Sequence, residues 1–152
     1  MKLSTRGRYG LKAIFDLAMN QSKGPVPLRE IATRQDISES YLEQLFANLR
    51  RAGLVKSVRG AHGGYMLGAL PEEIYIGQIL RTLEGNIAPT DCVNLDDLME
   101  CSDSDLCVTR TVWKKIRDSI NQVVDSTTLY DMILEQKLLE NKNASYRTFV
   151  GK

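Results

Sequence analysis

The sequence predicts a mainly α-helical fold: a winged helix-turn-helix with a two-stranded wing and a long C-terminal dimerisation helix. Three observations support this fold. Three amphipathic helical patterns follow one another, a Gly-tipped pair of short extended segments comes next, and a later helix carries a narrow apolar seam. We expect the winged helix at residues 1–84, a cysteine-containing loop at 85–108, the dimerisation helix with a short following helix at 109–136, and a flexible tail at 137–152.

The first helix is expected over residues 4–21, where apolar residues recur at the spacing of one helix face. These residues are Leu11, Ile14, Phe15 and Ala18. Gly24 and Pro25 end the pattern. Pro27 suits the first turn of a second, short helix, which stops near Gln35. Its inner face is formed by Leu28, Ile31 and Ala32.

The third helix is expected from Ser38 to about Ala52. Ser38 is a favourable N-cap, Glu39 complements the helix dipole, and Gly53 supplies the C-terminal stop. Its apolar face is formed by Leu42, Leu45, Phe46 and Leu49. The outer face carries short and medium polar side chains, which fit the major groove of a nucleic-acid duplex.

A hairpin is expected next, with extended segments at 54–59 and 65–67. Three glycines between them, in Gly60-Ala61-His62-Gly63-Gly64, permit a tight tip. A fourth helix follows, with Gly85 after its end and an inner face formed by Ile76, Ile79, Leu80 and Leu83.

The longest helix is expected to begin near Thr109. Its seam consists of Trp113, Ile116, Ile120, Val123 and Thr127. A seam this narrow can pack on the body of its own chain, but it is more typical of a helix that meets another helix, which favours a homodimer. Thr128 and Asp131 resemble a capping box for a last short helix that ends near Gln136.

Charge is divided unevenly along the chain. Residues 1–70 hold eleven Lys and Arg against five Asp and Glu, whereas residues 71–110 hold two against nine. A basic first half suggests a nucleic-acid-binding face, although chance surface variation gives similar asymmetry. No apolar run is long enough for a membrane span and the N-terminus lacks a signal core, so we expect a cytoplasmic protein without a membrane partner. The single histidine has no catalytic constellation around it, which argues against an enzyme with a small-molecule substrate.

The residues expected to contact double-stranded DNA lie on the third helix and the wing. Ser38, Ser40 and Tyr41 can bind phosphate, Glu43 can accept from cytosine, and Gln44 can pair with adenine. Arg59 at the wing tip can enter the minor groove. The remaining candidates are Arg50, Arg51, Lys56 and His62, with Arg6 and Arg8 as further phosphate contacts. Taken singly, most are equally compatible with ordinary exposed residues; their order along the chain favours DNA binding.

Three cysteines, Cys92, Cys101 and Cys107, lie within sixteen residues and there are no others. An odd number in a cytoplasmic chain argues against a disulfide framework. Thiolates are the usual protein ligands of iron–sulfur clusters, whereas structural zinc sites use close Cys-x-x-Cys pairs that are absent here. From spacing alone, a cluster, zinc and a role without a metal remain comparable.

Several motifs resemble the bacterial IscR-type iron–sulfur cluster regulators, whose superfamily includes NsrR, RirA and CymR. They are ISESYLEQLFANLRR at 37–51, GLVKSVRGAHGGYMLG at 53–68, the N-terminal MKLSTRGRYGLKAIFDLA and LEG at 83–85. The resemblance covers about residues 1–135 and implies a homodimeric winged-helix repressor of cluster-assembly genes that binds a palindromic operator. It also implies that Cys92, Cys101 and Cys107 hold a cluster, of the [2Fe–2S] type in IscR-like proteins and [4Fe–4S] in NsrR and RirA.

The sequence departs from this pattern at the fourth ligand. IscR-type proteins have a histidine three residues after the last cysteine, where this chain has Arg110, and the aspartate that NsrR uses corresponds to Arg8. An exogenous molecule or a residue of the partner chain could serve instead, as could one of the nearby carboxylates, which are Asp91, Asp96, Asp97, Asp103 and Asp105. Three alternative functions stay open: a nitric oxide or iron sensor similar to NsrR or RirA, a CymR-like regulator without a cluster, and an iron–sulfur electron carrier.

Overall fold

The computed structural model describes residues 3–94 and 106–150, and it confirms the winged helix-turn-helix. The helices are α1 (Thr5–Asn20), α2 (Leu28–Gln35), α3 (Glu39–Arg51), α4 (Ile76–Glu84), α5 (Val108–Ser126) and α6 (Leu129–Val150). The wing is the antiparallel pair β1 (Val55–Val58) and β2 (Gly64–Leu67). Short 3-10 turns lie at η1 (Gln21–Lys23), η2 (Pro71–Glu73) and η3 (Asp91–Val93).

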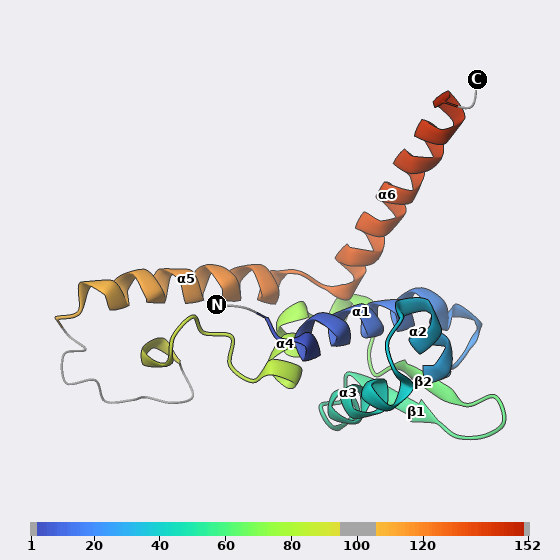
Figure 1. Cartoon of the computed structure of the whole chain (residues 1–152), viewed down its shortest axis with the longest axis horizontal. Helices are drawn as coiled ribbons and strands as arrows, with labels where there is room; N and C mark the ends of the chain where they lie inside the picture. The colour runs from blue at the N-terminus through green and yellow to red at the C-terminus, as the bar shows by residue number, and fades with distance from the viewer. Residues whose placement is uncertain (1–2, 95–105, 151–152) are drawn as a thin grey trace.

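The core lies where α1, α2, α3, α4 and the wing meet (Figure 1). The inner faces predicted for α3 and α4 are confirmed, because each of their residues is buried. On α1 the buried face is rotated relative to the predicted stripe. Its centre is Gly10, Ala13, Ile14 and Leu17, while Leu11, Phe15 and Ala18 pack beside it and are only partly buried.

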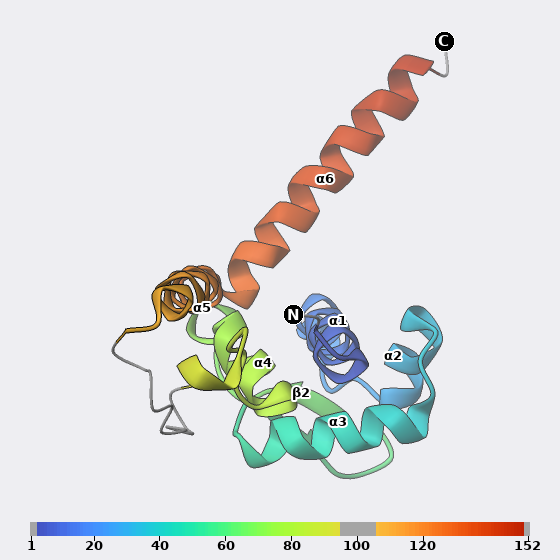
Figure 2. The same ribbon diagram turned by 60° about the vertical axis from the view of Figure 1, so that its left-hand side comes forward.

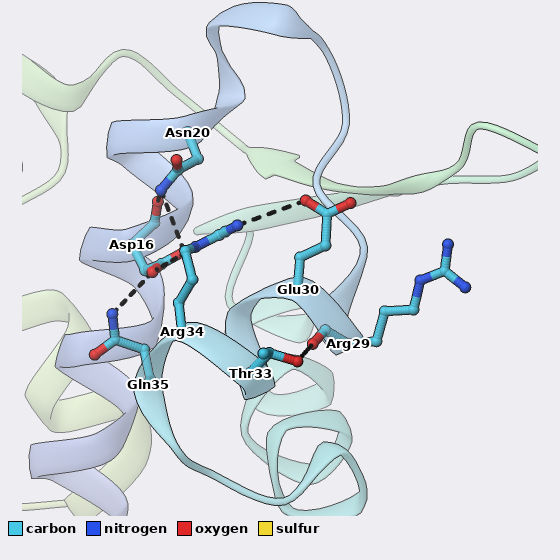
Figure 3. Close-up of polar contacts among 7 residues, drawn as sticks. All are labelled: Asp16, Asn20, Arg29, Glu30, Thr33, Arg34 and Gln35. Atoms are coloured by element: carbon cyan, nitrogen blue, oxygen red, sulfur yellow. Dashed lines mark hydrogen bonds and ion pairs between the residues drawn. The ribbon is translucent and has the colours of Figure 1, made fainter.

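A buried carboxylate fixes α2 on α1. Asp16 is 5% exposed and accepts hydrogen bonds from Arg34 Nη2 at 2.6 Å and from Gln35 Nε2 at 2.8 Å (Figure 3). A weaker bond comes from Asn20 at 3.4 Å. Helix α2 leads through a short turn into α3, so this cluster fixes the helix that directly precedes α3.

The second half of the molecule is more open. Figure 1 shows α5 extending along one side of the molecule. In both views α6 projects away from the body, opposite to α3 and the wing (Figures 1 and 2). No residue of α5 is fully buried. Within the described residues, no helix has the length and apolar character needed to cross a membrane.

Two predictions for this half are wrong. The last helix does not end near Gln136 but runs to Val150, so helix replaces most of the predicted flexible tail. The second wrong prediction is that the helix beginning near Thr109 is the longest: α6 has 22 residues, whereas α5 has 19. The reciprocal cap predicted at the start of α6 is present: the Thr128 N–H donates to Asp131 Oδ2 at 2.8 Å, and the Asp131 N–H donates to Thr128 Oγ1 at 3.1 Å.

Candidate nucleic-acid interface and cysteine segment

The outer face of α3 presents the polar side chains that the sequence assigns to DNA contact. Ser38 caps the helix, since its hydroxyl accepts the Tyr41 N–H at 3.3 Å. Ser40, Glu43 and Gln44 are exposed. The opposite face is anchored in the core by Leu42, Leu45, Phe46 and Leu49. The helix can therefore enter a groove without losing its packing.

Tyr41 is not a free surface residue, which the sequence did not indicate. It is half-buried, its hydroxyl donates to Thr5 Oγ1 at 3.4 Å, and its ring meets Tyr9 edge-on with centroids 6.3 Å apart. The start of α3 is thus held against the first turns of α1. A phosphate bound by Tyr41 would contact a side chain whose position α1 already restricts.

The two arginines at the end of α3 are both exposed. Arg51 hydrogen-bonds to the Asn48 side chain, and its Nε donates to the Ala47 carbonyl at 3.4 Å. Both arginines lie in the last turn, where they also complement the helix dipole.

The wing places Lys56, Arg59 and His62 in solvent. Its tip is closed by the Gly63 N–H, which donates to the Gly60 carbonyl at 3.0 Å, and Gly60 has a φ of 118° that favours glycine. Strand β2 of the wing is tied to α3, because the centroids of the Tyr65 and Phe46 rings lie 4.9 Å apart. The wing and α3 therefore form one surface on the same side of the molecule (Figure 2).

Sequence reasoning also missed a carboxylate that joins the end of α4 to the start of α1. Glu84 Oε1 accepts three hydrogen bonds: from Ser4 N–H at 3.0 Å, from Ser4 Oγ at 2.6 Å and from Gly7 N–H at 2.8 Å. The LEG motif contains this residue, but only the fold shows which helix it caps.

Two of the three cysteines lie within the described residues. Cys92 belongs to η3 and Cys107 is the N-cap residue of α5; Cys101 lies outside the described residues, as do Asp96, Asp97, Asp103 and Asp105. The Thr109 hydroxyl lies 3.1 Å from Cys107 Sγ, and this hydrogen bond, with a smaller effect of the Arg110 N–H, lowers the pKa of the thiol. Among the described residues, no group of three possible metal ligands is assembled.

Two arginines of α5 bring the cysteine segments together. Arg110 Nε donates to the Cys92 carbonyl at 3.2 Å, and Arg117 Nη1 donates to the Val93 carbonyl at 3.1 Å. Arg110 stands where a histidine ligand was expected, and its side chain holds the Cys92 backbone instead. Cys92 and Cys107 thus lie on elements that contact each other, η3 and α5.

Comparison with known proteins identifies relatives along most of the chain. Residues 3–135 match the family model Rrf2, described as an iron-dependent transcriptional regulator. The HTH-type transcriptional regulator CymR of Bacillus subtilis (strain 168) is 47% identical over 132 residues, which cover 87% of this chain and 89% of that protein. The HTH-type transcriptional regulator IscR of Pectobacterium carotovorum subsp. carotovorum (strain PC1) is 39% identical over 140 residues, covering 92% and 84%. The solved structure of T. potens IscR superposes with a TM-score of 0.74 at 48% identity, covering 90% of this chain and 88% of that one.

Proposed function

Since the chain belongs to the Rrf2 family of transcriptional regulators, we propose that two copies of it read a palindromic operator and that an iron–sulfur cluster controls this binding. The chain is a DNA-binding regulator rather than an enzyme, in agreement with the names of its relatives. The observation that carries the proposal is the continuous surface formed by α3 and the wing, joined through Phe46 and Tyr65.

On this surface the side chains divide into three kinds of contact: with base edges in the major groove, with the phosphate backbone and with the minor groove. Glu43 and Gln44 project from the middle of the exposed face of α3 and read base edges in the major groove. Ser38, Ser40 and Tyr41 at its start bind phosphate oxygens, with Arg50 and Arg51 at its end. On the wing, Arg59 enters the minor groove, while Lys56 and His62 lie along the backbone.

A homodimer supplies the second half-site. The proposal rests on α5, which lacks fully buried residues and exposes Val112 (50%) and Val123 (63%). Trp113, Ile116 and Ile120 of the expected seam are half-buried, and α5 runs beside α4 and η3 of its own chain. The exposed valines would then meet the partner, which places two α3 helices on one duplex.

The cluster would be held by Cys92, Cys101 and Cys107. Thiolate donors fit the group, and the Arg110 bond to the Cys92 carbonyl keeps two of them on adjoining elements. When bound, the cluster supplies a redox-sensitive and labile link between η3 and α5. Its presence would report cluster supply, and the regulated genes would be those of cluster assembly, with repression as the expected outcome.

Anaerobic purification followed by iron and sulfide analysis tests the sensing proposal. We expect a visible absorption band, near-equal iron and sulfide, and a DNA affinity that differs between the loaded and cluster-free protein. Replacing all three cysteines by alanine is expected to abolish the band and fix DNA affinity at the cluster-free value. Identical affinities in the loaded, cluster-free and triple-alanine proteins would contradict cluster control while leaving DNA binding intact.

A regulator without a cluster is the second candidate, and Arg110 is the observation that favours it. An arginine cannot ligate iron, and its side chain is engaged by the Cys92 carbonyl. If this candidate holds, the anaerobic protein carries no iron above background, and the triple-alanine protein binds the operator as the wild type does.

A further inference from the structure

Helix α4 contacts both halves of the molecule. On one side Gly77 allows α5 to approach closely, and Arg81 holds α5 by bonds to Asp125 at 2.6 Å and to Asn121 at 2.7 Å. At its C-terminal end, Glu84 caps α1. The helix therefore lies directly between the cysteine segment and the DNA-reading surface (Figure 2).

The Glu84 carboxylate helps to fix the start of α1. One oxygen accepts hydrogen bonds from the N–H and hydroxyl of the N-cap residue Ser4 and from the Gly7 N–H of the first turn. A Cβ atom at Gly7 would collide with this carboxylate, so the approach depends on glycine at that position. The negative charge also faces the positive end of the α1 dipole.

The first turns of α1 in turn contact the recognition helix. Thr5 follows Ser4 directly and accepts the Tyr41 hydroxyl at 3.4 Å, and Tyr9 packs edge-on against the Tyr41 ring. A displacement of Glu84 that shifted the start of α1 would thus reach α3 through two further contacts.

On its other side, Glu84 is connected to the cysteine segment. Gly85, with a φ of 80°, leads into Asn86, whose side chain hydrogen-bonds to the Asn94 side chain and to the Ala88 N–H. These bonds close the stretch 86–94 around Cys92. An apolar cavity of about 470 Å³ adjoins it, lined by Leu3, Leu80, Glu84, Asn86, Ile87, Ala88, Ile120 and Val124. The lining includes both Glu84 and residues 86–88, so a shift of that stretch would act directly beside the carboxylate.

We propose that Glu84 is a positioning residue that joins the cysteine segment to the recognition helix through the start of α1. A shift of residues 86–94 on cluster binding at Cys92 would move the Glu84 carboxylate, and with it Ser4 and Gly7 and thereby Tyr41. The regulatory part of this inference rests on the proposed cluster control, whereas the contact between Glu84 and α1 acts in the cluster-free protein as well.

Three alanine variants of the full chain test the link. Glu84→Ala removes the carboxylate, and Gly7→Ala displaces it while keeping its charge and favouring helix. Asp131→Ala is the matched control, because Asp131 Oδ2 caps α6 by accepting the Thr128 N–H and hydroxyl, both at 2.8 Å. This cap lies beyond the C-terminal end of α5, whereas Cys107 precedes its N-terminal end. For each protein, operator affinity is measured by fluorescence anisotropy with and without the cluster, beside the thermal midpoint.

We expect Glu84→Ala and Gly7→Ala to weaken operator binding by the cluster-free protein by roughly fivefold or more, a typical size for coupling between sites. Both are also expected to bring the ratio of loaded to cluster-free affinity close to one, with the absorption band retained. Asp131→Ala is expected to change neither quantity. Wild-type operator affinity in both variants would overturn the inference. It would also be overturned if Asp131→Ala lost as much operator affinity as these variants at an equal drop in the thermal midpoint. If the wild-type ratio is itself one, cluster control fails, and the cluster-free affinities alone decide the role of Glu84.

Discussion

Asp16 shows how one side chain can fix the relative position of two helices. Its carboxylate accepts hydrogen bonds from Arg34, Gln35 and Asn20 beside an otherwise apolar core (Figure 3). The sequence did not predict this cluster, because the buried face of α1 is rotated toward Asp16 relative to the apolar spacing. A lone acid beside such a stripe is more often exposed, and only the packing of α2 shows otherwise.

Replacing Asp16 by asparagine is expected to lower the free energy of unfolding by about 1–3 kcal/mol. The loss stays below that of a fully buried ion pair because the Arg34 side chain is 35% exposed. Urea unfolding followed by circular dichroism at fixed protein concentration measures it. Glu30→Gln is the matched control, since Glu30 pairs with the same arginine at 3.5 Å in solvent and its loss is expected to cost under about 1 kcal/mol. Equal losses in the two variants would contradict the assigned role.

Glu43 is expected to read a base rather than to add affinity. Glu43→Ala therefore relaxes discrimination at one base pair of each half-site by about 1–3 kcal/mol and leaves other positions unchanged. Anisotropy titrations against operators with single substitutions measure this change. The control is Glu135→Ala, an exposed acid of α6. A uniform change across all substituted operators would show that Glu43 affects affinity only through charge.

At the scale of elements, a helix could be predicted from the sequence where its start, its apolar face and its end are all marked by residues within the segment itself. Helix α3 was predicted closely because its N-cap, its stripe and its glycine stop all lie within the segment. Helix α6 was predicted too short because no buried apolar face marks its length beyond Ile133: Leu134, Leu138 and Leu139 are exposed. The bond between Glu84 and Ser4 spans 80 residues, so no local spacing reveals it.

The junction of α4 with α5 is expected to weaken in acid. Hydrogen bonds from Arg81 lower the pKa of Asp125 below its usual value of 3.8. The folded pKa lies below the unfolded one, so the stabilisation is complete above the unfolded value and is lost as the pH falls through the folded value. Trp113, the single tryptophan, lies on α5 and reports the change by fluorescence between pH 6 and roughly pH 2.5.

Asp125→Asn supplies the comparison for this titration. The variant is expected to lack the part of the acid transition that depends on Asp125 and to show a looser α5 already at neutral pH. An acid transition of the same midpoint and amplitude in both proteins would contradict a contribution from the ion pair.

At the scale of the whole molecule, the structure shows where the basic residues of the first half of the chain lie. The basic residues of the first half include those exposed on α3 and the wing, which lie on one side, opposite to α6 (Figure 1). The sequence predicted this surface because its elements follow one another along the chain. It could not predict how α5 and α6 lie, because those helices depend on contacts between distant segments.

Binding at this surface is expected to weaken steeply with salt, with a log–log slope of about −0.9 for each phosphate neutralised. Lys56→Ala is expected to reduce the slope by about two per dimer and to weaken binding similarly on all sequences. Lys142→Ala, on the exposed part of α6, is the control and is expected to leave the slope unchanged. Equal slopes in the wild-type and Lys56→Ala proteins would contradict a phosphate contact made by the wing.

Selection of bound fragments from a random duplex pool tests most directly whether two recognition helices act on one duplex. The account predicts enriched sequences with two-fold symmetry, with half-site centres separated by about 10 base pairs or a multiple of it, and complexes containing two protein chains. Enrichment of a single asymmetric half-site by one chain, or no enrichment above the starting pool at low salt, would contradict it.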